Sequence, residues 1–150
     1  MSKYHFEFNQ ELAYKLRNYN SYSVTLQYCD YVKSYINKIK DKKEHLKAIK
    51  AFTSVNKTEE LYTKVCKLYI ESNIKFLKII FNKLGKKILE IHNKKLYHLS
   101  QCLDKNNPQV YNDICTMISI IWKQRIKYAI EKSTNYEKTI NNNFEIVDNN

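Results

Sequence analysis

Residues 70–91 read IESNIKFLKIIFNKLGKKILEI, and this stretch decides the fold. Large apolar side chains recur in it at alternating intervals of four and three residues: Ile70, Ile74, Leu77, Phe81, Leu84, Ile88 and Ile91. This alternation is typical of one apolar seam on an α-helix that packs against other helices. The repeat stays in phase through Gly85, the single glycine of the chain. The sequence therefore predicts an all-α protein organised around this seam.

The composition also favours helices and a single domain. The 150 residues include one glycine and one proline, whereas the hairpins of a multi-stranded sheet typically use several turn-forming residues. A chain of this length suffices for one domain with a sizeable core. We expect an antiparallel helical bundle over residues 1–140, with one short and three long helices. Residues 141–150 are expected to form a disordered polar tail.

Start signals define the expected helices. The short helix is expected over residues 7–19 and the first long one over 24–52. Thr58 is predicted to cap the next helix, over 59–103, because Glu59 and Glu60 follow it and complement the helix dipole. Asn107 and Pro108 are predicted to open the last helix, which is expected to end between residues 134 and 140. Its window 114–122 is the most apolar in the chain and should be the densest part of the core.

Two alternatives remain open at Gly85, because a glycine can sit inside a helix or end one. A helix that is continuous over 59–103 would be about 67 Å long. Neighbours of about 30 residues could not cover it, so the seam would need a partner or a second copy. Two helices hinged at Gly85 would instead allow a compact five-helix bundle that is complete as a monomer.

The net charge of +11 points to an anionic partner, although only weakly. Arginine, which is favoured for bidentate phosphate and base contacts, occurs at two positions only, Arg17 and Arg125. Lysine suits diffuse attraction to lipid headgroups or a nucleic-acid backbone, with no sequence readout. The candidate anion-binding residues flank the seam on one helix face: Lys83, Lys86, Lys87 and Lys94.

The sequence offers little chemistry for catalysis. A single glycine excludes glycine-rich phosphate loops and the GxSxG nucleophile motif. His98 and Cys102 share a helix face, but a zinc site would also need Cys66 or Cys115 from a neighbouring helix. We expect no enzyme activity, no catalytic residue, no cofactor, no metal and no small-molecule substrate.

Two function hypotheses follow. The first is a non-enzymatic interaction or adaptor protein that assembles with itself or a protein partner through the seam. The second is a lysine-rich helical module that binds an anionic surface, either a nucleic-acid backbone or an anionic membrane. No apolar run is long enough to span a membrane and no secretory signal is apparent, so we expect a soluble intracellular protein, cytoplasmic or nuclear.

Overall fold

The computed structural model describes the backbone of residues 7–148 and the side chains of residues 7–132. Its elements are α1 (Gln10–Leu16), α2 (Ser21–Lys38), α3 (Lys42–Glu71), α4 (Lys75–Leu103) and α5 (Pro108–Asp148). Residues 7–148 contain no strand, which confirms the predicted all-α class. No helix in this part of the chain is both long and apolar enough to cross a bilayer.

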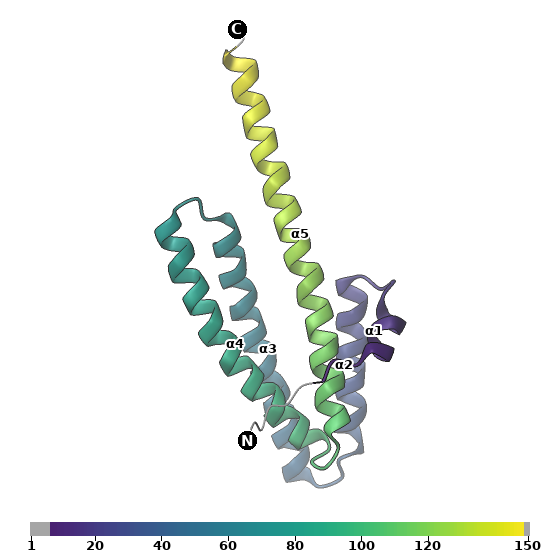
Figure 1. The fold of residues 1–150 in the computed structure, drawn as a ribbon. Coiled ribbons are helices and arrows are strands. Elements are labelled where there is room, and N and C mark those ends of the chain that lie inside the picture. Colours follow the sequence, from purple (N-terminus) through teal and green to yellow (C-terminus); the bar gives the residue numbers. More distant parts are fainter. Residues whose placement is uncertain (1–6, 149–150) are drawn as a thin grey trace.

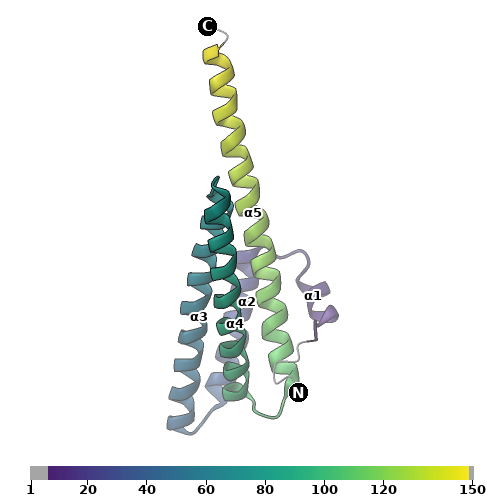
Figure 2. The same cartoon turned by 60° about the vertical axis from the view of Figure 1, so that its left-hand side comes forward.

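The long helices turn back beside one another at short connections (Figures 1 and 2). The α2–α3 and α4–α5 connections lie at one end of the molecule, and the α3–α4 connection lies towards the other. α3 and α4 therefore form a helical hairpin, whose tip is residues 72–74. α5 packs against α2 and α4 and then extends beyond the hairpin tip.

The core lies where the four long helices overlap. It combines α2, the first half of α3, the second half of α4 and the first half of α5. Residues 114–118 are all buried, as predicted for this apolar window. The most deeply buried aliphatic side chains are Val24, Val32, Val55, Leu96, Leu99, Val110, Ile114 and Ile121.

Helix α1 is shorter than predicted and is tied to α5. Asn9 caps it by accepting a hydrogen bond from the Leu12 N–H at 3.1 Å, so the helix begins at Gln10 and not at residue 7. The backbone N–H of Asn9 also donates to Thr116 Oγ1 at 3.0 Å, and its side-chain amide donates to Asp113 at 2.8 Å. These contacts dock the N-terminal helix against the body.

The predicted long helix over 24–52 is wrong, because the chain turns at residues 39–41. Asp41 caps α3: its Oδ1 accepts a hydrogen bond from the Glu44 N–H at 3.0 Å. An aspartate followed three residues later by a glutamate is a helix-start signal. The neighbouring Lys42 interrupts the apolar spacing of the predicted helix, and α3 begins at that residue. The protein thus has four long helices and not three.

The predicted helix start at Glu59 is also wrong. Thr58 lies in the middle of α3, where its hydroxyl donates to the Ser54 carbonyl at 3.0 Å instead of capping a helix end. Thr58 and Val55 are both buried, so tertiary packing favours a continuous helix through the polar residues around them. The break falls at residues 72–74, between α3 and α4.

Helix α4 continues through Gly85, so the hinge alternative is wrong at this position. The seam is divided at the hairpin tip instead: Ile70 belongs to α3, Ile74 is the N-cap of α4, and the remaining seam residues lie in α4. At the other end of the chain, α5 extends to Asp148, past the predicted end between 134 and 140. Residues 141–148 of the predicted tail are helical, while residues 149–150 lie outside the described chain. No glycine or proline follows Pro108 to end this helix.

Replacement of Gly85 by alanine should stabilise the protein. The glycine has no positive φ, and an added Cβ would lie 3.7 Å from Val65 Cγ1 and 3.9 Å from Tyr62 Cε2, which is ordinary contact. A gain of about 1 kcal/mol is expected from helix propensity, which corresponds to a rise in Tm of about 3 °C. Thermal unfolding followed by circular dichroism measures it. Gly85→Pro is the matched control and should lower the Tm, whereas a lower Tm for Gly85→Ala would contradict a continuous helix.

Candidate functional site

The hairpin exposes a set of large aliphatic side chains at intervals of seven residues. We call this set the outer face; it comprises Leu61 and Leu68 of α3 with Leu77, Leu84 and Ile91 of α4. Their exposed fractions range from 36% for Leu77 to 50% for Leu61 and Ile91. An interval of seven residues is about two helical turns. The two residues of α3 therefore form one straight ladder along their helix, and the three residues of α4 form another.

On α3, the outer face lies on the side away from α5. Val65 faces α4, whereas Tyr62 stacks on Trp122 of α5 with ring centroids 4.4 Å apart. At about 100° per residue, Leu61 and Leu68 lie on the other side of Val65 from Tyr62. They are therefore turned away from α5 and remain in solvent.

The same holds on α4. Leu89 and Asn93 line a cleft that is shared with α5. Ile91 lies about 160° around the helix from Leu89, and Leu84 is on the same side as Ile91. The two helices thus present their exposed aliphatic ladders to the same side of the hairpin.

The predicted seam is only partly a free surface. Ile88 is 5% exposed and belongs to the packed interior, while Ile70 and Phe81 are half-buried. Ile74, Leu77, Leu84 and Ile91 are exposed. The sequence did not predict Leu61 and Leu68 as partners of the seam, although their seven-residue spacing was a usable signal.

The candidate anion-binding lysines are all exposed on α4: Lys83, Lys86, Lys87 and Lys94. Each lies three or four residues from another member of the set, except Lys94, which lies two turns beyond Lys87. Exposure at these positions fits both a solvated helix face and contact with an anionic surface.

The first turns of α4, at the hairpin tip, carry a broad exposed apolar surface. Phe76, Leu77, Ile79 and Ile80 are all exposed, and Phe76 reaches 69%. At about 100° per residue, these four side chains cover an arc of about 160°, and Lys75 and Lys78 lie outside it. An apolar arc of this width normally faces a protein core, so its exposure is unusual for a surface element.

A polar junction joins α2, α3 and α5 about halfway along α3. Glu59 of α3 accepts hydrogen bonds from Arg125 Nη1 at 2.9 Å and from Trp122 Nε1 at 3.3 Å, both on α5. Arg125 Nη2 also donates to Thr25 Oγ1 of α2 at 3.3 Å. The Glu59 side chain is 15% exposed and the Arg125 side chain 37%, so the carboxylate is shielded while the guanidinium partly reaches solvent.

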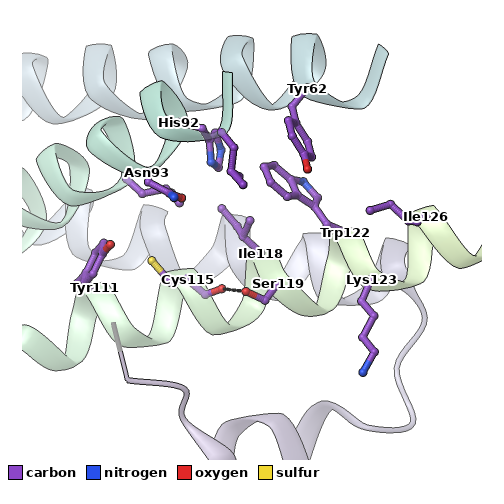
Figure 3. Close-up of a pocket in the computed structure, with 12 residues that line it drawn as sticks. Tyr62, His92, Asn93, Tyr111, Cys115, Ile118, Ser119, Trp122, Lys123 and Ile126 are labelled. Carbon is purple, nitrogen blue, oxygen red and sulfur yellow. Dashed lines mark hydrogen bonds between the residues drawn. The ribbon is translucent and has the colours of Figure 1, made fainter. Parts of the chain in front are cut away.

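A cleft of about 470 Å³ lies between α4 and α5, with Tyr62 of α3 at its edge (Figure 3). In its aromatic wall Trp122 lies between Tyr62, on which it stacks, and the tilted ring of His92 (Figure 3). The Trp122 and His92 ring centroids are 4.8 Å apart. The lining residues from α4 are Leu89, His92, Asn93 and Leu96, and those from α5 are Tyr111, Cys115, Ile118, Ser119, Trp122, Lys123 and Ile126.

His92 is the most unusual polar group of this cleft. Its ring is fully buried, and neither Nδ1 nor Nε2 has a hydrogen-bond partner among the described residues. Desolvation, reinforced by the nearby positive charge of Lys95, lowers the pKa of His92 to about 4. The imidazole is therefore neutral at physiological pH, with one donor and one acceptor nitrogen.

The cysteines are placed for packing. Burial raises the pKa of the Cys29, Cys66 and Cys102 thiols, and that of Cys115 to about 12. The thiolate, which is the nucleophile and metal ligand, is thus disfavoured at neutral pH. Cys102 Sγ lies 3.7 Å from His98 Nε2. Within the described residues, however, no three side chains of the metal-ligating types come together.

Comparison with known protein families, curated proteins and solved structures finds no match to this chain. Its function is therefore argued from the outer face, the hairpin tip and the cleft.

The burial of His92 should make stability depend on pH. Because the folded pKa of about 4 lies below the ordinary value of 6.5, the unfolded chain binds more protons between these values. The free energy of unfolding should fall by up to about 3 kcal/mol as the pH drops from 6.5 to 4. Urea unfolding at a series of pH values measures this change. In His92→Leu the free energy of unfolding should change less between pH 6.5 and 4. An equal slope in that variant would show that His92 is not the source of the pH dependence.

Proposed function

We propose that this chain is a non-enzymatic interaction protein that assembles with a second copy or a protein partner through the outer face. In this proposal the four long helices form an antiparallel bundle, which holds the hairpin out from the body. The supporting observation is the pair of exposed aliphatic ladders. Single exposed apolar residues are normal, whereas a contiguous set is typical of an interaction site.

The spacing of the outer face supports a helical partner. Side chains repeated every seven residues on two neighbouring helices leave grooves that accept the ladder of another helix pair. A second hairpin laid against this one would bury Leu61, Leu68 and Leu84 at the centre of a four-helix arrangement. Fully burying one such side chain contributes about 1.5–3 kcal/mol, so a few of them suffice for stable association.

Leu84→Asp should abolish assembly through the outer face, because it places a charge at the centre of the apolar ladder. Size-exclusion chromatography with light scattering is expected to show an oligomer for the wild type and a mass near 18.1 kDa for the variant. Leu26→Asp is the matched control: Leu26 is similarly exposed but lies on α2, so the oligomer should persist. A monomeric wild type would contradict self-association, and an intact Leu84→Asp oligomer would contradict this interface.

We infer a second candidate function from the hairpin tip, namely adsorption to an anionic membrane. A broad exposed apolar arc at a helix start suits insertion of that face into a lipid interface. Lys75 and Lys83 border the apolar tip and can interact with anionic headgroups. A nucleic-acid backbone would account for these lysines but not for the exposed Phe76 and Ile79.

Vesicle binding tests this second candidate. The wild type should co-sediment with phosphatidylcholine vesicles that contain about 30% phosphatidylserine, and binding should weaken as salt is raised. Phe76→Ser should lower the partition coefficient about tenfold, because it removes a large apolar side chain from the interface. Leu26→Ser is the control and should bind as the wild type does. Absence of binding at low salt, or equal binding by Phe76→Ser, would contradict a membrane role.

A further inference from the structure

We propose that the cleft between α4 and α5 binds an uncharged, mainly aromatic small molecule that carries one hydrogen-bonding group. This site is separate from the outer face, since the cleft residue Leu89 and the outer-face residue Ile91 lie about 160° apart on α4. The sequence does not predict the site, because its walls come from segments that are far apart in the chain.

The dimensions and walls of the cleft fit a small molecule. Its volume of about 470 Å³ lies within the range of known ligand sites. On α5, the lining residues Cys115, Ile118 and Trp122 follow one helix face, so they form a continuous wall. Tyr111 closes one end of the cleft and Tyr62 lies near the other (Figure 3). A flat ring can stack or make edge contacts with such aromatic walls.

The unpartnered His92 ring indicates the polar part of the ligand. A buried polar group without a hydrogen bond costs about 1–3 kcal/mol, and buried polar groups in native proteins are normally satisfied. The ring lines the cleft and points into the space between α4 and α5 (Figure 3). A ligand hydroxyl could donate to the bare imidazole nitrogen or accept from the protonated one. Because the ring is fully buried, a lining side chain must move before a ligand can reach it.

The charges around the cleft favour a neutral ligand. Lys123 is the charged residue of the lining, and its side chain points away from His92 and Trp122 (Figure 3). Ser119 does not offer a free donor either, since its hydroxyl donates to the Cys115 carbonyl at 2.8 Å. A ligand carboxylate inside the cleft would thus lose hydration without gaining an ion pair.

Three probes of nearly equal shape test the ligand class: 2-naphthol, naphthalene and 2-naphthoate. Trp122 is the only tryptophan in the chain, so its fluorescence and the His92 ring resonances in NMR report binding at the cleft directly. We expect 2-naphthol to bind about tenfold more tightly than naphthalene, which corresponds to one hydrogen bond. The charged 2-naphthoate should bind more weakly than 2-naphthol.

Two variants locate the site. Asn93 lines the cleft and is exposed, so Asn93→Trp should fill the opening without disturbing the core and should abolish binding. His92→Leu should retain naphthalene binding and remove the preference for 2-naphthol. If His92→Leu does not fold, the proposal is still tested by two results: the preference of the wild type for 2-naphthol over naphthalene, and the binding measured for Asn93→Trp. The proposal is overturned if none of the probes binds at about 1 mM, if Asn93→Trp binds as the wild type does, or if 2-naphthoate binds best.

Discussion

The ion pair between Glu59 and Arg125 links the α3–α4 hairpin to the rest of the molecule. It joins α3 to α5, and the same arginine reaches Thr25 on α2. Trp122 donates to the same Glu59 carboxylate, and this hydrogen bond holds the indole against the middle of α3. Charge-assisted hydrogen bonds are among the stronger polar contacts, and the loss of Arg125 would leave the Glu59 carboxylate poorly solvated. The junction therefore holds three helices in one relative arrangement.

On one side of this junction the helices share a common core, and on the other the hairpin and α5 extend with fewer neighbours (Figure 1). The outer face, the hairpin tip and the cleft all lie where the helices have fewer neighbours. The outer face and the tip are exposed because no helix within residues 7–148 covers that side of the hairpin. The cleft lies beside Trp122, whose indole packs against Tyr62 and His92. The same packing arrangement thus leaves both an exposed apolar surface and a cavity of about 470 Å³.

The helical class and the start of α5 could be predicted because their signals are local. Asn107 Oδ1 accepts from the Gln109 N–H at 3.1 Å, and Pro108 opens the helix as its residue type predicts. The breaks at 39–41 and 72–74 were missed because neither contains glycine or proline. The apolar spacing continues across 72–74, and after 39–41 it resumes at Leu46 with Lys42 as its one defect. Thr58 is a residue type that commonly caps helices. Burial against α4, with a hydrogen bond from Lys95 at 2.8 Å, nevertheless keeps it inside α3.

The sequence by itself determined that the protein is helical and that an apolar ladder runs through Gly85, because both depend on residues within a few turns of one another. Only the tertiary structure decided which part of that ladder is covered: Ile88 is buried and Leu84 is exposed, although both obey the same spacing. It also decided that His92 and Trp122, thirty positions apart, meet at one cleft. Helical periodicity places a side chain on a face of its own helix, whereas burial depends on where the other helices end.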